Sequence, residues 1–219
     1  MKEFFPVLQK CTLFDGIDVA DMDGLLACLG GKVMSAKKNT PIWSEGDPAL
    51  YIGIVLTGAV QIVKDDIFGN RTILSQAGPS ELFGESFAAG DISTLPVSIL
   101  AVQDSQYLLI DCHRITVSCA NACGFHSQMI HNLLRVMAQK NLQFSQKLEI
   151  TAQRTTRDKL LSYLNAQAKH WGSRSFTIPF DRQALADYLG VERSAMSAQI
   201  SKLRDDGVIA CEKSHFTLL

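Results

Sequence analysis

Apolar residues between positions 181 and 203 recur at helical spacing in two separate stripes. These stripes are Ala184, Leu185, Tyr188 and Leu189, followed by Ala195, Met196, Ile200 and Leu203. Gly190 separates them, and glycine tolerates the left-handed backbone needed to leave a helix. Asp181 precedes the first stripe, where its carboxylate can accept hydrogen bonds from the free amides of a helix start. The pattern predicts a helix, a short glycine turn and a second helix.

Polar side chains gather on the other side of the second predicted helix. They are Arg193, Ser194, Ser197, Ser201 and Lys202. A helix fits the DNA major groove, residues near its start reach base edges, and arginine can bind guanine through two hydrogen bonds. We therefore expect Arg193 to read bases and the others to make shorter or phosphate contacts, with Arg182 and Gln183 as further DNA-contacting candidates. On this stretch alone, a solvated face of an ordinary helical hairpin is the alternative.

Segments on both sides of these two helices extend the motif. An amphipathic helix is predicted over residues 154–168, with Leu160, Leu161 and Leu164 turned inward, and a β segment at 176–178 follows it. After the second helix, residues 207–209 and 215–218 predict a β-hairpin. The whole region therefore predicts a winged helix-turn-helix.

Short β-rich runs, punctuated by glycine and proline, begin at about residue 35, after a helix predicted at 18–29. The runs are residues 40–43, 50–56, 59–64, 71–75, 97–102 and 106–110. Turn sequences such as Gly69-Asn70 separate them, so the region predicts an antiparallel β-roll or barrel. The histidines of the chain stand at positions 113, 126, 131, 170 and 215, outside these runs. A roll-type metal site would lack its usual imidazole ligands, which leaves a ligand-sensing or purely structural roll.

A heptad pattern runs along the helix predicted from about residue 125 to 151. Its positions are Ile130, Leu134, Met137, Asn141, Phe144, Leu148 and Thr151. Such a seam is typical of paired helices, and a central asparagine sets the register and favours two strands. We expect a parallel homodimer. The alternative is a helix packed only on its own domain, but such a helix would show a wider apolar stripe than this seam. Two symmetric reading heads would bind palindromic double-stranded DNA.

Composition and charge are compatible with this interpretation. The chain has 219 residues, 47% of them hydrophobic, which suits one large or two modest domains. Residues 1–151 carry 11 Lys and Arg against 15 Asp and Glu, whereas residues 152–219 carry 10 against 7. The positive second region favours contact with phosphates. No apolar run suits a membrane span or a leader, so we expect a cytoplasmic protein with no membrane partner.

The six cysteines show no paired framework, and reduced thiols are expected. Cys119, Cys123 and His126 stand at i, i+4 and i+7 and would share one face of a continuous helix, as metal ligands can. Gly124 interrupts that helix, and small buried cysteines are common in cores, so we favour a structural role and predict no metal site. No Ser/His/Asp or Cys/His pairing occurs at a recognisable spacing, and we therefore predict that the protein is not an enzyme.

The order of these parts and several of their residues resemble the Crp/Fnr family, the cyclic-AMP receptor protein and fumarate-nitrate reductase regulators. The resemblance is carried by EGDPALYIGIVLTGAVQIV at 45–63, LFGES at 82–86, TTRDKLLSYL at 155–164 and RQALADYLGVERSAMSAQISKLRDDGVI at 182–209. It implies an α+β fold with an N-terminal cyclic-nucleotide-binding-like antiparallel β-roll at 1–124. A long dimerisation helix at 125–151 and a winged helix-turn-helix DNA-binding domain at 152–219 follow. It also implies a homodimeric transcription regulator, with RNA polymerase as a further candidate partner.

Carried over by resemblance, Arg193 matches the base-reading arginine at the second position of the family's recognition-helix motif. Ser194 stands where many members have a glutamate, and Ala198 stands where many have a second arginine. The resemblance therefore implies a different DNA half-site, read with fewer charged contacts.

The effector end departs further from the family pattern. In the cyclic-nucleotide binders a Gly-Glu pair, here Gly84-Glu85, meets the ribose, and an Arg-Ser pair holds the phosphate. The Arg-Ser positions align near Pro96-Val97, and no Lys or Arg occurs from residue 72 to 113. Burying a phosphate without a cation or many amides is costly, so we expect that cyclic AMP is not the effector. The expected pocket is lined by Gly84, Glu85, Ser86, Leu95, Val97 and Ser98 and is closed by the long helix near Leu133.

This expected lining is neutral to acidic, which suits an apolar or cationic small molecule better than an anion. A filled, ligand-free core is the alternative. Some relatives carry an iron–sulfur cluster on an N-terminal cysteine array, but only Cys11 and Cys28 stand in that half of this chain. The function expected is DNA-binding transcription regulation controlled by an unidentified small-molecule or redox signal at the roll. The alternative is a small-molecule or redox-binding module whose helix-turn-helix serves protein contact.

Overall fold

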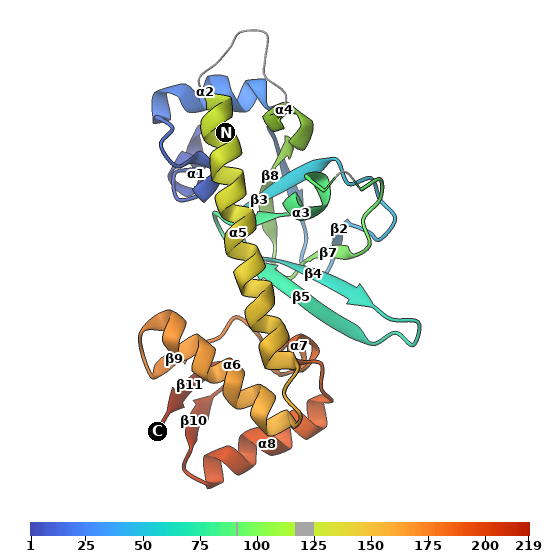
Figure 1. Cartoon of the computed structure of the whole chain (residues 1–219), viewed down its shortest axis with the longest axis vertical. Helices are drawn as coiled ribbons and strands as arrows, with labels where there is room; N and C mark the ends of the chain where they lie inside the picture. The colour runs from blue at the N-terminus through green and yellow to red at the C-terminus, as the bar shows by residue number, and fades with distance from the viewer. Residues whose placement is uncertain (91, 117–124) are drawn as a thin grey trace. The chain divides into compact units, whose positions relative to one another are not determined.

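The computed structural model describes residues 1–90, 92–116 and 125–219. The chain forms two compact units, one of Met1–Asn70 with Leu74–Asn141 and the other of Arg71–Ile73 with Leu142–Leu219 (Figure 1). A helix of 27 residues, α5 (Phe125–Thr151), contributes to both units. None of the helices in the described ranges is both long and apolar enough to cross a membrane.

The β-roll consists of two antiparallel sheets. Its strands are β1 (Lys32–Ala36), β2 (Pro41–Trp43), β3 (Tyr51–Thr57), β4 (Val60–Asp65), β5 (Arg71–Ala77), β6 (Leu82–Phe83), β7 (Ser98–Ala101) and β8 (Ser105–Asp111). One sheet has the strand order β1-β8-β3-β6, and the other has the order β2-β7-β4-β5. The expectation of an antiparallel roll is confirmed.

Strand β3 is buried on both of its faces. Its residues 52–56 are all inaccessible to solvent, a pattern that requires cover on each side of the sheet. Val55 packs in a core between the two sheets, with Phe83 of β6 and Ile99 of β7. Ile52 and Ile54 point to the opposite side, into a second core formed with helices. The sheet that contains β3 therefore separates two apolar cores.

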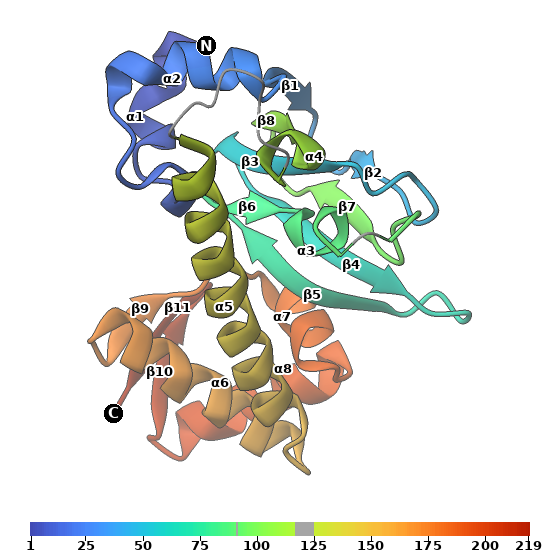
Figure 2. The ribbon, with the colours of Figure 1, turned by 45° about the horizontal axis from the view of Figure 1, so that its top comes forward.

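Short helices and α5 supply the second core. The short helices are η1 (Lys2–Phe4), α1 (Phe5–Leu8), η2 (Thr12–Phe14), α2 (Val19–Cys28), α3 (Glu85–Ala88) and α4 (Cys112–Thr116). Leu8, Phe14 and Leu26 from the N-terminal helices meet Met129 and Leu133 of α5 in this core. Figure 2 shows α5 running past the N-terminal helices and β6. The first half of α5 is therefore part of the roll's own packing.

The second unit is a winged helix-turn-helix. Its elements after α5 are α6 (Thr156–Trp171), β9 (Ser175–Thr177), α7 (Arg182–Leu189), α8 (Arg193–Asp205), β10 (Ile209–Glu212) and β11 (His215–Leu218). The strands pair antiparallel in the order β10-β11-β9. Leu164 of α6, Leu185 of α7 and Met196 of α8 are fully buried, as is Phe216 of β11. The predicted α+β architecture is confirmed for both units.

Two strands were missed by the sequence pattern. β1 lies at a sheet edge and leaves most of its residues exposed or half-buried, so it lacks a clear apolar alternation. β6 has only two residues, too few for any alternation to develop. Both strands exist because neighbouring strands β8 and β3 offer them backbone partners.

Gly53 tests the tight packing inside the roll. A Cβ added at Gly53 would lie 2.1 Å from the Phe83 ring, so Gly53→Ala is expected to lower the free energy of unfolding by about 1–3 kcal/mol. Gly24→Ala is the control, because within the described chain no neighbour comes within 4 Å of its added Cβ. That helical substitution should stabilise by about 0.5–1 kcal/mol. Urea unfolding measures both, and equal midpoints for the two variants would contradict the described contact.

Candidate nucleic-acid interface and signal site

The helix-turn-helix forms by the local interactions that its sequence predicts. Oδ1 of Asp181 accepts a hydrogen bond of 2.8 Å from the amide of Ala184 at the start of α7. Gly190 has a φ of 61° at the end of α7, in the left-handed region that favours glycine. The cap and the turn are both confirmed, and together they fix where α8 begins.

One face of α8 is buried and the other is open to solvent. Met196, Ile200 and Leu203 pack inward, whereas Ala195, which the pattern assigned to the same apolar stripe, is exposed. Among the DNA-contacting candidates on this helix, Ser197 is half-buried. The exposed ones are Arg193, Ser194, Ser201 and Lys202. Within the described part of the chain, the guanidinium of Arg193 has no hydrogen-bond or ion-pair partner.

Arg182 and Gln183 lie at the start of α7 in different environments. The guanidinium of Arg182 lies 5.2 Å above the Phe216 ring, and its Nη2 donates to the Cys211 sulfur at 3.6 Å. Arg182 therefore joins α7 to the hairpin of β10 and β11. Gln183 is exposed, and its side-chain amide donates to Asp187 at 2.8 Å. Direct DNA contact by these two residues remains a prediction.

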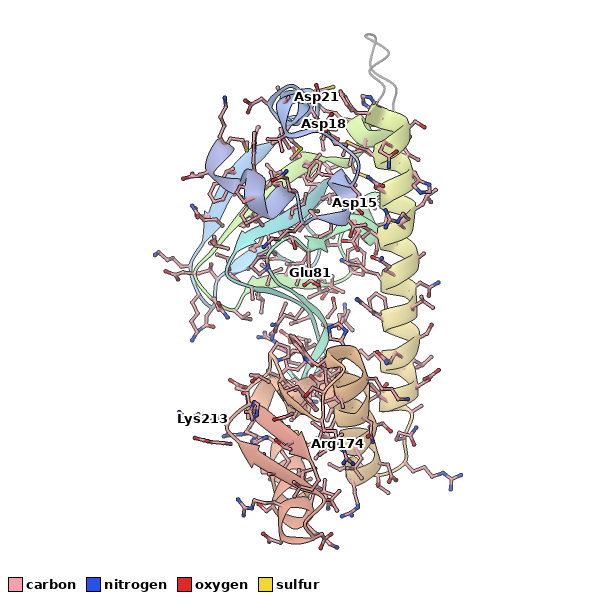
Figure 3. The ribbon with its side chains drawn as sticks, turned by 90° about the vertical axis from the view of Figure 1, so that its left-hand side faces the viewer. Asp15, Asp18, Asp21, Glu81, Arg174 and Lys213 are labelled. Carbon is pink, nitrogen blue, oxygen red and sulfur yellow. The ribbon has the colours of Figure 1, made fainter. Side chains whose placement is uncertain are left out.

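The hairpin of β10 and β11 carries a cation that the sequence interpretation did not select. Lys213 occupies the turn with a φ of 51°, is exposed, and is labelled at the end of the hairpin in Figure 3. An exposed lysine at such a tip is suited to phosphate contact. Its position between two strands is readable in the sequence, but one lysine in a turn is too common a feature to indicate a role.

Helix α5 presents two apolar stripes that are offset by one residue. Met129, Leu133 and Val136 are buried in the roll, so α5 carries a second, domain-packed stripe beside the predicted seam. Several seam residues are instead open to solvent. They are Ile130, Leu134, Asn141, Phe144 and Leu148, and the exposed fractions of Leu134 and Leu148 are 64% and 69%. Met137 is half-buried and touches the Ser86 hydroxyl at 4.0 Å.

A buried asparagine fixes α5 against the N-terminal segment, and it is not the asparagine of the predicted seam. Asn132 is fully buried and donates from Nδ2 to the carbonyls of Leu13 and Asp15, at 3.0 and 2.8 Å. Arg135 forms an ion pair of 3.1 Å with the Asp15 carboxylate, which Figure 3 labels beside α5. These contacts determine which side of α5 faces the roll.

The predicted effector residues divide over two places. Gly84, with a φ of 78°, precedes α3, and Glu85 and Ser86 form its first turn. Leu133 packs in the core beneath the helices, whereas Val97 packs in the core between the sheets. Leu95 is also buried, and Ser98 accepts a hydrogen bond of 3.0 Å from the Glu45 amide. The expected pocket as a whole remains a prediction.

Two lysines from outside residues 72–113 reach this region, which changes its expected charge. Lys140 of α5 lies 2.8 Å from Oε1 of Glu85 and donates to the Leu82 carbonyl at 2.7 Å. Lys64 of β4 pairs with Glu45 and donates to the Pro96 carbonyl at 2.8 Å. The inference of a neutral to acidic lining was incomplete, because both cations come from elements distant in sequence.

Family models match both units. The model of the cyclic nucleotide-binding domain matches residues 33–116, and the model of the Crp-like helix-turn-helix domain matches residues 158–219. The chain belongs to the Crp/Fnr family. The proteins of this family to which it is similar are transcription regulators, not enzymes.

Individual relatives are distant but span most of the chain. The transcriptional activator protein anr of Pseudomonas aeruginosa is 23% identical over 208 residues, which cover 93% of this chain and 82% of that protein. The transcriptional activator protein FnrL of Cereibacter sphaeroides is 27% identical over 188 residues, covering 79% and 70%.

Among solved structures, FixK2 of Bradyrhizobium japonicum has a TM-score of 0.69 and 21% identity, with 86% of this chain and 92% of that chain covered. The c-di-GMP responsive regulator CLP of Xanthomonas campestris has a TM-score of 0.75 and 18% identity, covering 92% and 99%. At these identities the likeness establishes the Crp/Fnr fold.

Two of the four cysteines that the structure describes, Cys11 and Cys112, are buried. Cys11 is buried, and burial raises the pKa of its thiol to about 12; burial also raises the pKa of Cys112. Cys119 and Cys123 lie outside the described residues. His126, the third member of that predicted set, is buried with Nε2 3.0 Å from the Arg114 carbonyl. Across the described ranges, no three His, Cys, Asp or Glu side chains are grouped to hold a metal ion.

Lys147 of α5 contacts an aromatic cluster that includes Tyr188 of α7. Its ammonium group lies 4.3 Å from the centre of the Tyr188 ring and donates a hydrogen bond to the Ile73 carbonyl. Tyr188 packs against Phe180 and Tyr163, with ring centroids 4.9 and 5.5 Å apart. Desolvation lowers the pKa of Lys147 from 10.5 to about 8. Within this unit, a partly buried cation therefore supports the helix that precedes the α8 turn.

The pKa of Lys147 predicts a pH dependence of stability. Below about pH 8 the residue is protonated in both the native and unfolded states, so it adds no slope. Between about pH 8 and 10.5 the unfolded state retains a proton that the native state has lost, so this group makes stability rise with pH. Comparing urea unfolding at pH 7 and pH 9.5, Lys147→Met should lack this rise.

The control for Lys147→Met is Lys169→Met, which removes an exposed lysine of the same unit and should keep the pH dependence of the wild type. Burial raises the pKa of Tyr163 and Tyr188, which makes stability fall with pH. This opposing effect begins near pH 10, where tyrosines of the unfolded chain ionise, and is therefore small at the two pH values compared. Identical slopes for wild type and Lys147→Met would contradict the assignment.

Proposed function

We propose that this Crp/Fnr protein is a homodimeric, sequence-specific regulator of transcription that reads palindromic double-stranded DNA through α8. Its relatives are DNA-binding transcription regulators. The observation that carries the proposal is the exposed guanidinium of Arg193 on a helix whose opposite face is fully buried. Ser194, Ser201 and Lys202 are exposed on the same helix, and the hairpin carries the exposed Lys213.

The exposed apolar stripe of α5 supports the homodimer. Leu134, Phe144 and Leu148 recur at heptad spacing and remain on the surface of a single chain, while the buried stripe is satisfied by the roll. A second copy of the same helix would cover them in a parallel pair. Two α8 helices related by that symmetry would then meet successive major grooves of one duplex.

The signal that controls DNA affinity acts at the β-roll and is not cyclic AMP. The position that would hold the cyclic phosphate is occupied by Pro96 and Val97, and the nearby Lys64 is already engaged by Glu45 and the Pro96 carbonyl. A phosphate buried there would lack a free cation. A regulator of this kind works in the cytoplasm, where it reaches the chromosome and RNA polymerase.

Arg193→Ala tests base reading. Loss of a bidentate contact to guanine should weaken binding to a DNA site selected by the purified protein about 5- to 150-fold, with little effect on unselected DNA. Lys202→Ala is the comparison, because loss of a phosphate contact weakens binding to all sequences alike and lowers the salt slope by about 0.9. Fluorescence anisotropy measures both, and a selection that enriches no sequence would favour a protein-contact role for the helix-turn-helix.

Leu134→Glu tests the dimer. A charge in the exposed stripe should convert the protein from a dimer of twice the chain mass of 24.0 kDa to the monomer, because a buried unpaired carboxylate is costly. Leu50→Glu is the control, since Leu50 is 57% exposed in the segment just before β3 and its substitution should leave the mass unchanged. Light scattering after size-exclusion chromatography gives the masses. A wild-type protein that is monomeric at every concentration would refute the proposed seam.

A further inference from the structure

A buried ion pair lies at the end of the roll where the family resemblance puts the effector. The side chains of Glu85 and Lys140 are 3% and 23% exposed, and their charged atoms are 2.8 Å apart. Lys140 also donates to the Leu82 carbonyl at 2.7 Å, and the Ser86 hydroxyl donates to the same Glu85 oxygen at 3.1 Å. The ammonium group is therefore held by a carboxylate and a carbonyl, as a bound ligand would be.

The Glu85 carboxylate is satisfied on one oxygen only. Oε1 receives Lys140 and Ser86, whereas Oε2 is buried and has no hydrogen-bond partner within the described residues. A buried carboxylate needs a cation and several hydrogen bonds to remain charged. Glu85 therefore depends on Lys140 as its counter-ion, and its second oxygen keeps an acceptor available for one more donor.

We propose that the ammonium group of Lys140 is a built-in ligand of the roll. It occupies the Glu85 site from within the chain, so this end of the roll is filled when no small molecule is present. A signal molecule that binds at Glu85 must displace Lys140 and must bring a compact cation of its own, of which a primary amine in its protonated form is the simplest. Anionic ligands are excluded from this position by the carboxylate.

Displacement has a mechanical consequence, because Lys140 belongs to α5 and Glu85 belongs to α3. The ion pair lies one turn before Phe144 of the exposed stripe, and together with the contact between Ser86 and Met137 it ties the two helices together. A ligand that takes the place of Lys140 frees this part of α5 from α3. The rest of the attachment, through Asn132 and the Leu13 and Asp15 carbonyls, stays in place.

Chemical rescue of Lys140→Ala tests this assignment. The substitution removes three methylene groups and the ammonium group, which together have the size of propylammonium. It vacates the space that the side chain filled, which is partly exposed to solvent. Lys140→Ala is expected to lower the melting temperature by about 6–20 °C, since Glu85 loses its counter-ion. Propylammonium chloride should restore most of this loss. Tetramethylammonium chloride at the same ionic strength should not, because it cannot donate hydrogen bonds.

Two further variants separate site occupancy from a general effect on folding. Glu85→Gln/Lys140→Ala lacks the carboxylate and should show no response to propylammonium beyond that of the salt. Arg135→Ala removes the exposed ion pair to Asp15 on the same helix; it should lower the melting temperature by at most about 4 °C and should not be rescued. If Lys140→Ala does not fold alone, the same question is tested by refolding it with and without propylammonium. Near-ultraviolet circular dichroism then measures whether folding depends on the amine.

The proposal is overturned if Lys140→Ala melts like the wild type, or if propylammonium restores no more than tetramethylammonium does. A second readout, DNA affinity of Lys140→Ala, rests on the DNA-binding function proposed above; it should differ from that of the wild type with or without propylammonium, because the free amine fills the site but does not tie α5 to α3. The two proposals fail separately. Absence of selective DNA binding in the wild type removes the proposed function, whereas thermal rescue is measured without DNA and decides the Lys140 site alone.

Discussion

The rotation of α5 about its own axis is the constraint on which the other features depend. Met129, Leu133 and Val136 must enter the roll core, and the buried Asn132 must reach the carbonyls of Leu13 and Asp15, so only one rotation satisfies the buried groups. That rotation leaves the neighbouring stripe, with Leu134 and Leu148, on the surface. The same choice directs Lys140 toward Glu85. Packing of the roll thus decides which residues are offered to a second copy.

The helix-turn-helix was predictable because its determinants are local. Asp181 caps an amide three residues away, Gly190 leaves the helix that precedes it, and the buried positions of α7 and α8 follow the helical period. Each of these signals lies within a few residues of its effect. The exposure of Ala195 shows the limit, since alanine satisfies either face of a helix and only the neighbouring elements determine which face it occupies.

The signal site was less predictable because its charges come from distant parts of the chain. Glu85 meets Lys140, 55 positions later, and Pro96 meets Lys64 of another strand. Residues 72–113 do contain no Lys or Arg. That observation did not predict the charge of the site, because side chains from other elements also contribute to it. The sequence pattern showed only one stripe on α5, because the polar residues Asn132 and Lys140 interrupt the second stripe, to which Met129 and Val136 belong.

Lys140 and Lys147 show how one helix can serve both units. They are seven residues apart on the continuous α5, so they lie on nearly the same face of it. Within the first unit Lys140 contacts Glu85, and within the second Lys147 contacts Tyr188 of α7.

A ligand at Glu85 can shift the equilibrium between two arrangements of α5 only by the difference in its affinity for them. A cation that binds Glu85 too weakly to displace Lys140 would leave DNA affinity unchanged. Control therefore requires that the incoming group satisfy Glu85 better than Lys140 does, and the unpaired Oε2 is the atom at which an additional hydrogen bond can provide that difference.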